Sequence, residues 1–300
     1  MSLRILARRI RFYYKRNSLQ LYREEFKNYR RAWFFPLFGD GKFIPRNGLD
    51  AVRVPRQRWS SLTTVARLLR MGARPTWKGE TLEVTWNDLI FVQPAGEKWT
   101  PQIMVEDPWH TKGQDLRGKV VIDIGAFIGD SSIAYAAAGA DVHAFEAVPS
   151  FAKCAAQNAR MNKLDGSITV HGVGLSNTNK LVSDTKQVRS IASMSHNCLS
   201  DDTSQKVYLV DAIGYLRMHE IHHADIVKMN CEGGEYDLLS DTRILDYLKP
   251  QSLVVDYHYG SEKLRQVLSD GGYSIEDSSP GAERGTLFAT KQAHMERMAG

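Results

Sequence analysis

The residues with the clearest chemical potential lie between positions 123 and 146. The run DIGAFIGDS places Gly125 and Gly129 where a tight turn and a close backbone approach to a ligand are possible. Glu146 follows Gly125 by 21 residues, a spacing at which a carboxylate can accept both hydroxyls of a ribose. The run lacks GxGxxG spacing and a terminal Lys-Ser/Thr, and Asp123 adds a negative charge that a pyrophosphate would not favour. A cofactor with a ribose and a cationic sulfonium, S-adenosyl-L-methionine, fits this pattern. The expected cofactor-binding residues are Asp123, Gly125, Ala126, Phe127, Gly129, Asp130, Ser131 and Glu146.

Alternating strands and helices after residue 118 must position these side chains. Residues 120–124 form a short apolar run typical of a buried parallel strand, and residues 131–138 are alanine-rich and predict a helix. Repeated units of this kind predict an α/β fold with a doubly wound, mostly parallel sheet, which binds ligands beyond the carboxyl ends of its strands. Further strands are predicted at 142–146, 168–170, 226–229, 253–257, 273–276 and 287–290, and helices at 149–162, 211–219, 235–248 and 261–270.

Five stretches between residues 115 and 260 carry a resemblance to a known family. They read VVIDIGAFIGDSS, GADVHAFEAVPSFAKCAAQNARMN, HGVGLSN, DIVKMNCEGGEYDLL and VVDYHYG. In these stretches the chain resembles the FkbM-type methyltransferases. The resemblance implies a Rossmann-like class I methyltransferase fold and S-adenosyl-L-methionine as methyl donor. It also implies O-methylation of a hydroxyl on a sugar, a glycan, a glycolipid or a related small molecule.

The same resemblance implies that Glu232, Glu235 and His258 lie near the methyl acceptor. His258 is the natural base at neutral pH, and Glu232 is the alternative base or a carboxylate that binds the acceptor. Asn230 and Glu235 are expected to bind the acceptor. The family usually has Asp where this chain has Asn230, and usually has Glu-Pro-x-Pro where residues 146–149 read Glu-Ala-Val-Pro, so the acceptor chemistry departs from the family pattern.

Composition excludes several classes of protein. The 300 residues are 43% hydrophobic and 24% charged, as in soluble globular proteins, and contain no run of 18 apolar residues. The first 16 residues are too basic for a secretory signal, and the three cysteines form no CxxC pair, so we expect a cytoplasmic protein without disulfides. The histidines at 219, 222 and 223 have no acidic or cysteine partner at a recognised spacing, and we expect no metal there.

Charge divides the chain into two parts. Residues 1–78 hold 19 Lys and Arg against 4 Asp and Glu, whereas the remaining residues hold 20 against 30. We therefore expect a basic, mostly helical N-terminal region at 1–78, a methyltransferase domain at 79–291 and a flexible tail at 292–300. Within the boundary region, residues 62–69 predict a short helix and residues 81–92 a hairpin that turns near Asn87 and Asp88.

An apolar stripe at helical spacing runs through residues 1–33. Three interpretations stay open: a helix docked on its own domain or on a partner, peripheral contact with an anionic membrane, and contact with nucleic acid. Members of the stripe are Leu3, Leu6, Ile10, Tyr13, Leu19, Tyr22, Phe26, Tyr29 and Trp33.

Two other functions remain as alternatives. An RNA methyltransferase would use the basic arm on phosphates, but the chain has neither an Asn/Asp-Pro-Pro-aromatic motif nor a Pro-Cys nucleophile. A non-catalytic binding protein would keep the fold without the chemistry, and Asn230 is its best support. The sequence leaves the acceptor and the oligomeric state open.

Overall fold

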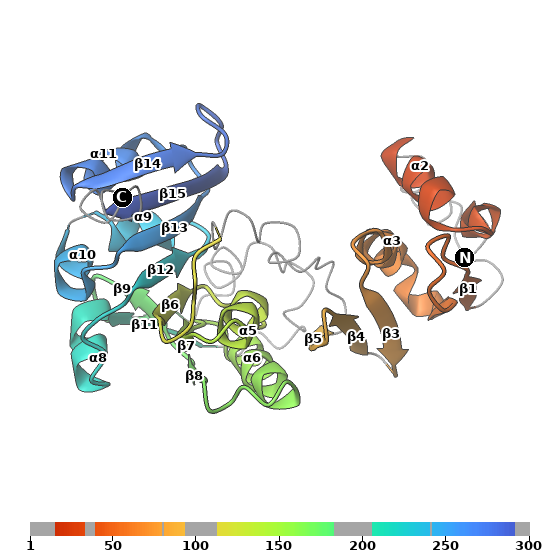
Figure 1. Cartoon of the computed structure of the whole chain (residues 1–300), viewed down its shortest axis with the longest axis horizontal. Helices are drawn as coiled ribbons and strands as arrows, with labels where there is room; N and C mark the ends of the chain where they lie inside the picture. The colour runs from red at the N-terminus through yellow and green to blue at the C-terminus, as the bar shows by residue number, and fades with distance from the viewer. Residues whose placement is uncertain are drawn as a thin grey trace. The chain divides into compact units, whose positions relative to one another are not determined.

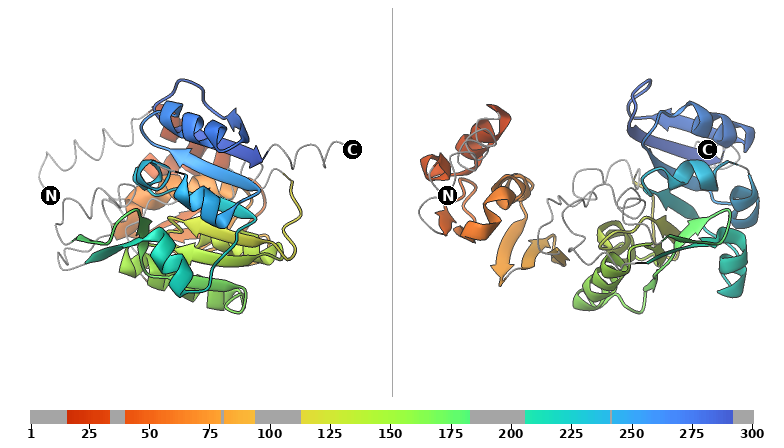
Figure 2. Two further views of the ribbon diagram at one scale, coloured as in Figure 1. Left: turned by 90° about the vertical axis from the view of Figure 1, so that its left-hand side faces the viewer. Right: turned by 180° about the vertical axis from the view of Figure 1, so that it is seen from behind.

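The chain divides into two compact units, Met1–Thr100 and Pro101–Gly300, each drawn in Figures 1 and 2. The computed structural model describes residues 16–33, 40–79, 81–93, 113–182, 206–240 and 242–291. Residues 1–15 of the predicted arm and the predicted tail at 292–300 lie outside the described residues. Over the described residues, no helix is long and apolar enough to cross a membrane.

The first unit contains both helices and strands. Within the described part of residues 1–78, helical segments hold more residues than strands do, in line with the expected mostly helical region, although the strands there were not predicted. Two small antiparallel sheets accompany its helices: β1-β2, in which residues 41–43 pair with residues 52–54, and β3-β4-β5. The predicted hairpin and the short predicted helix are present as β4-β5 and α3. Its elements are α2 (Arg16–Glu25), η1 (Tyr29–Trp33), β1 (Gly41–Phe43), β2 (Val52–Val54), η3 (Arg56–Ser61), α3 (Leu62–Arg70), β3 (Arg74–Lys78), β4 (Thr81–Trp86) and β5 (Leu89–Gln93).

Aromatic residues of the predicted apolar stripe form the core of this unit. Tyr22 and Phe26 are 1% and 0% exposed, and the Phe26 ring centroid lies 5.1 Å from that of Phe43. The Tyr22 hydroxyl is 2.7 Å from the Thr63 hydroxyl of α3, so α2 docks on its own unit. Of the three interpretations of the stripe, docking on its own domain holds for this segment. These two buried rings are not available to a membrane surface, and membrane contact through residues 1–33 stays a prediction.

The division between the units is not at residue 78. Lys78 ends β3 and pairs with Thr81 at the start of β4, so a boundary at that point would cut a hairpin. The charge balance changes near residue 78 while the backbone pairing continues to β5. The change in charge near residue 78 therefore does not coincide with the boundary between the two units, because strand pairing continues past it to β5.

The second unit contains a seven-stranded sheet in the order β14-β15-β13-β12-β6-β7-β8. Strands β13, β12, β6, β7 and β8 run parallel, and β15 is antiparallel to both β13 and β14. This arrangement confirms the predicted Rossmann-like, doubly wound and mostly parallel sheet. The strands are β6 (Val120–Ile124), β7 (Asp141–Phe145), β8 (Ile168–His171), β12 (Ile226–Met229), β13 (Ser252–Tyr257), β14 (Tyr273–Asp277) and β15 (Gly285–Lys291).

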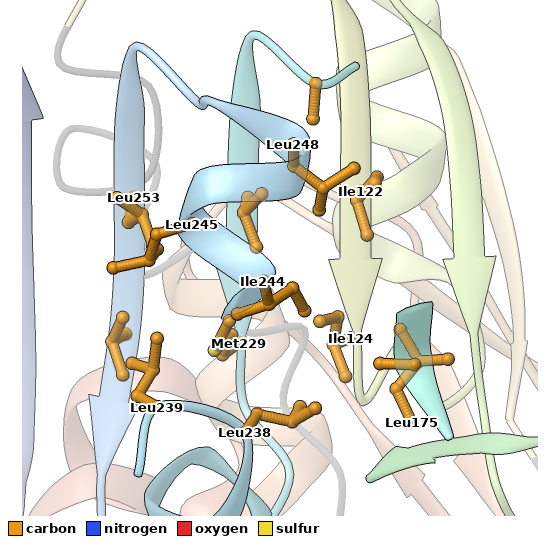
Figure 3. Packing of buried hydrophobic residues seen from close by; sticks show 14 of the residues in the cluster. Ile122, Ile124, Leu175, Met229, Leu238, Leu239, Ile244, Leu245, Leu248 and Leu253 are labelled. Atoms are coloured by element: carbon orange, nitrogen blue, oxygen red, sulfur yellow. The ribbon is translucent and has the colours of Figure 1, made fainter. Parts of the chain in front are cut away.

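Helices cover both faces of this sheet. Helices α5 and α6 contact β7 and β8 from one side, and the other face carries a large apolar core. Figure 3 shows this core, in which side chains of α10 lie over Met229, Leu253 and Ile122 of the sheet. The helices are α5 (Asp130–Ala137), α6 (Pro149–Met161), α8 (Ala212–Met218), α9 (Gly234–Leu238), α10 (Arg243–Leu248) and α11 (Glu262–Asp270).

Two features of this unit differ from the predictions. The helix predicted over 235–248 is two short helices, α9 and α10, which both contribute leucines to the core. A small sheet formed by β9 (Gly174–Ser176), β10 (Lys180–Val182) and β11 (Val207–Asp211) was not predicted. Its strands are only three to five residues long, and β9 pairs with β11 across more than 30 residues of chain, so no local pattern indicates the pairing.

Candidate active site

The loop after β6 passes very close to the end of the neighbouring strand β12. Gly125 has φ +79°, and a Cβ at this position would overlap the backbone carbonyl of Asn230. The amides of Gly125 and Ala126 both donate to the carbonyl oxygen of Phe145, at 2.9 and 3.0 Å. The loop is thus tied to β7 on one side and pressed against β12 on the other. Gly125 is required by both its backbone conformation and this contact.

Gly125→Ala is therefore expected to lower the free energy of unfolding by about 2–5 kcal/mol, from the overlap and the left-handed backbone together. Gly166→Ala is the matched control, because its added Cβ would meet no atom within 4 Å. Chemical denaturation measures the free energy of unfolding, and calorimetry measures the affinity for S-adenosylhomocysteine, which this loop is expected to bind. Equal stability and ligand affinity in the two variants would show that the loop has room at Gly125.

A buried ion pair lies under the same loop. Asp123 is 0% exposed and accepts hydrogen bonds from the hydroxyls of Ser131 and Ser132, each at 2.6 Å. Lys228, opposite Asp123 on β12, places Nζ 3.0 Å from its Oδ1 and 3.3 Å from the carbonyl oxygen of Gly125. Burial alone would raise the pKa of Asp123, but Lys228 and the two hydroxyls together hold it below its ordinary value. This network fixes the loop and the start of α5.

Glu146 follows the last residue of β7 beside the loop and is 7% exposed. Its Oε2 accepts the amide of Phe127 and its Oε1 accepts the amide of Val148, both at 2.8 Å. Burial raises the pKa of Glu146 to about 7, although these two amides oppose the rise. A carboxylate oxygen can accept more than one hydrogen bond, so both oxygens retain capacity for ligand hydroxyls.

A second cluster lies at the carboxyl ends of β12 and β13. Oε1 of the fully buried Glu235 is 2.9 Å from Nδ1 of His258, and Oε2 of Glu232 is 3.4 Å from its Nε2. Burial lowers the pKa of His258, but the two carboxylates outweigh it and raise this pKa to about 9. His258 is therefore an imidazolium at neutral pH. Glu235 also accepts the amide of Gly233 at 2.9 Å, so its carboxylate is used within the protein.

Backbone strain marks both loops. Phe127 has φ +52° and Glu232 has φ +54°, conformations that L-residues rarely adopt outside turns and helix ends. The two residues follow β6 and β12, which are neighbours in the sheet and end at the same edge. Such strain persists where the surroundings hold it, and it concentrates at functional sites. The two loops together therefore form the candidate active site.

The chain matches the family described as methyltransferase FkbM domain over residues 123–275, about half of its length. It belongs to this family. The match starts at Asp123 and includes both loops. A comparison with curated proteins gives no match.

Solved structures of other methyltransferases are similar to this chain at low identity. The FkbM methyltransferase from Methylobacillus flagellatus KT is 19% identical with a TM-score of 0.40, and the alignment covers 57% of this chain and 43% of that one. The precorrin-6y C5,15-methyltransferase from Geobacter metallireducens GS-15 is 15% identical with a TM-score of 0.38, covering 59% and 81%. The magnesium protoporphyrin IX methyltransferase from Synechocystis PCC 6803, with bound S-adenosylmethionine, is 15% identical with a TM-score of 0.38, covering 66% and 87%. This chain thus spans less than half of the length of the first of these proteins.

The cofactor of the FkbM family is S-adenosyl-L-methionine, and the residues present fit it. Glu146 offers a carboxylate with remaining acceptor capacity to the ribose hydroxyls. Lys228 is 2% exposed and paired with Asp123, so it presents no positive charge to a cationic sulfonium. These residues therefore fit a cofactor that carries a ribose and a cationic sulfonium.

The structure places the predicted cofactor residues in two roles. Glu146 can face a ligand, whereas Asp123 and Ser131 are 0% and 3% exposed and bond to each other. Asp123 and Ser131 thus support the loop through each other, and their predicted direct contact with the cofactor stays a prediction. Ala126 and Asp130 are likewise 1% and 4% exposed. Phe127 packs edge-on against Phe151, and Gly129 lies against Ala155 of α6 with φ +81°.

The acceptor-side predictions change as well. Glu235 is buried and bonded within the protein, so it positions His258 and the loop and is not available to bind an acceptor directly. The two flanking carboxylates raise the pKa of His258 to about 9, which favours the protonated imidazole near pH 7 and disfavours its predicted role as a neutral base. Asn230 is half-buried, and its backbone amide donates to the carbonyl oxygen of Ile124 at 2.8 Å, between the two loops.

Binding of the cofactor product to this FkbM-family chain is expected to depend on pH through Glu146. With a pKa of about 7, the carboxylate that accepts the ribose hydroxyls is largely lost below neutral pH. S-adenosylhomocysteine should bind about tenfold more weakly at pH 6 than at pH 8. His258 keeps its charge over this range, because its pKa is about 9. Titration calorimetry checks the dependence, and Glu146→Gln should bind weakly with no pH dependence; a wild-type affinity that is constant from pH 6 to 8 would contradict the assignment.

Sequence reasoning missed Lys228. The signal was present, because one lysine interrupts the apolar strand Ile226–Met229, and a lysine inside a buried strand requires a partner. Its partner could not be named without the register that sets it opposite Asp123.

The three neighbouring histidines at 219, 222 and 223 each contact a different residue. His219 stacks on Tyr215, His222 is 2.7 Å from the Tyr247 hydroxyl, and His223 is 3.7 Å from Asp225. Over the part of the chain that the structure describes, no group of three or more potential ligand side chains is arranged to hold a metal ion.

Proposed function

We propose that this protein transfers a methyl group from S-adenosyl-L-methionine to a hydroxyl of a sugar, a glycan or a glycolipid. The observation that carries the proposal is the cluster of Glu232, His258 and Glu235 at the edge of the sheet where the cofactor loop also ends. A carboxylate beside an imidazolium suits an uncharged hydroxyl, since it accepts the hydroxyl's hydrogen bond and then its proton. The departure from the family at Asn230 leaves this carboxylate in place.

Glu232 is the proposed base. It is partly exposed, whereas Glu235 is fully buried, so Glu232 is the carboxylate of the cluster that an acceptor can reach. His258 holds Glu232 in place through Nε2 and is itself held by Glu235 through Nδ1. Because His258 is already protonated, its role is to orient Glu232 and to offset its charge.

The bound cofactor supplies an activated methyl on a sulfonium, so the protein's contribution is mainly alignment and proton removal. Glu146 holds the ribose side of the cofactor, and the loop of Gly125 contacts the backbone of Asn230, two residues before Glu232. Cofactor and acceptor residues therefore lie on loops that touch. This contact supports transfer between ligands bound at the same sheet edge.

The test supplies methyl-labelled S-adenosyl-L-methionine and full-length protein to an extract of the source cells. The products are separated into lipid, glycan and RNA fractions. We expect label in the glycan or lipid fraction as an alkali-stable methyl ether. Label in RNA would favour the alternative function with a basic arm, and cofactor binding without label in any fraction would favour the non-catalytic alternative.

A further inference from the structure

An exposed aromatic side chain lies against the loop that carries the proposed base. Tyr259 is 65% exposed, although its two predecessors, Tyr257 and His258, are 1% and 6% exposed. Its ring lies against the backbone of Gly233, where an added Cβ would be 2.9 Å from Cε2 of Tyr259. Gly233 follows Glu232 in the chain and has φ +109°. Because Gly233 has no side chain, the ring of Tyr259 can lie close to the loop that carries Glu232.

The backbone under Tyr259 is held in place by a second tyrosine. Its amide donates to the Tyr236 hydroxyl at 2.9 Å, and that hydroxyl donates to the carbonyl oxygen of Gly260 at 2.7 Å. The rings of Tyr236 and Tyr259 have centroids 5.9 Å apart. The amide of Gly260 in turn donates to the carbonyl oxygen of Glu283 at 2.8 Å. The exposed ring therefore projects from an anchored turn.

We propose that Tyr259 is a platform for the apolar face of a pyranose ring, with one ring hydroxyl directed to Glu232. A sugar presents C–H groups on its faces and hydroxyls around its edge, so an aromatic face beside a carboxylate matches both parts. A cationic acceptor fits less well, because the His258 imidazolium lies 3.4 Å from Glu232 and offsets its charge. The inference rests on the proposed function and names its acceptor as a pyranose and its specificity residue as Tyr259.

The experiment measures binding of sugars to the full-length protein saturated with S-adenosylhomocysteine. The probes are methyl α-glucopyranoside, α-mannopyranoside, α-galactopyranoside and α-rhamnopyranoside at millimolar concentration, and the readout is saturation-transfer NMR. We expect saturation on ring C–H protons of at least one probe. Tyr259→Ala should weaken its binding about fivefold or more, whereas Tyr259→Phe and Tyr259→Trp should keep it, because stacking requires the ring and not the hydroxyl.

Tyr208→Ala is the matched control, since Tyr208 is a 51% exposed tyrosine on β11 outside the cluster. It should leave sugar binding unchanged, and S-adenosylhomocysteine affinity should be the same in all variants. Wild-type affinity in Tyr259→Ala would overturn the platform and leave the proposed function intact. Absence of binding by any pyranoside to the wild type would overturn the platform, and label in RNA alone in the extract experiment would overturn the proposed function separately.

Discussion

Replacing Glu232 by Gln is expected to lower kcat by about 10²–10⁴, the usual contribution of a positioned base. Gln keeps the size and one hydrogen-bonding oxygen of Glu232 but cannot take the acceptor proton. The affinity for S-adenosylhomocysteine should change by no more than about twofold, because Glu232 is assigned to the acceptor side. Steady-state rates with the labelled acceptor and calorimetry with the product give the two quantities.

The pH dependence of the wild type distinguishes Glu232 from His258 as the base. With a pKa of about 9, His258 loses its proton only at high pH, so a neutral-imidazole mechanism would gain about tenfold in kcat per pH unit from 6.5 to 8.5. We expect kcat at saturating cofactor to stay nearly constant over that range. Glu262→Gln, an exposed carboxylate on α11, is the control and should retain the wild-type rate. A steep rise with pH, or full activity in Glu232→Gln, would return the role of base to His258.

Lys228→Met is expected to lower the free energy of unfolding by about 3–5 kcal/mol, because it leaves the carboxylate of Asp123 buried without its cation. The side chains of Lys228 and Asp123 are 2% and 0% exposed, so solvent cannot compensate. The Gly125 carbonyl also loses a donor 3.3 Å away, so S-adenosylhomocysteine should bind more weakly. Chemical denaturation and calorimetry measure the two effects.

A double variant separates the ion pair from the packing of the lysine stem. Asp123→Asn together with Lys228→Met should cost less than the sum of the single changes, since no uncompensated charge remains. Lys153→Met, on the exposed side of α6, should change stability by no more than about 0.5 kcal/mol. If Lys228→Met were as stable as Lys153→Met, the ion pair of Asp123 and Lys228 would not be what holds the loop in place.

Local sequence patterns determined most elements of the second unit. The apolar run of β6 and the alanine-rich α5 were predicted to within a residue or two, because burial on both faces of a parallel strand and helical propensity both act over short windows. The division into α9 and α10 was not predicted, since both segments carry apolar residues that pack into one core. Periodicity indicates that residues are buried, but it does not say that one continuous helix buries them.

For the N-terminal unit, the sequence determined the stripe but not what the stripe contacts. Tyr22 and Phe26 fall at helical spacing, and that spacing is equally suited to a domain core, a lipid surface or a partner. Tertiary packing decided between them, because Phe43 and Thr63, distant in sequence, supply the contacts that bury the two rings. The basic charge of the region says nothing about this choice.

In the active site, the sequence by itself determined which residues gather at the sheet edge, and only the tertiary structure decided their ionisation and roles. Asp123, Glu146, Glu232 and His258 follow or end parallel strands, and parallel strands end at a common edge. The pKa of each group depends on burial and on charges from other strands, such as Lys228 beside Asp123 and Glu235 beside His258. These partners are 23 to 105 residues away in the chain, so no local pattern could show that Asp123 supports the loop or that His258 is protonated.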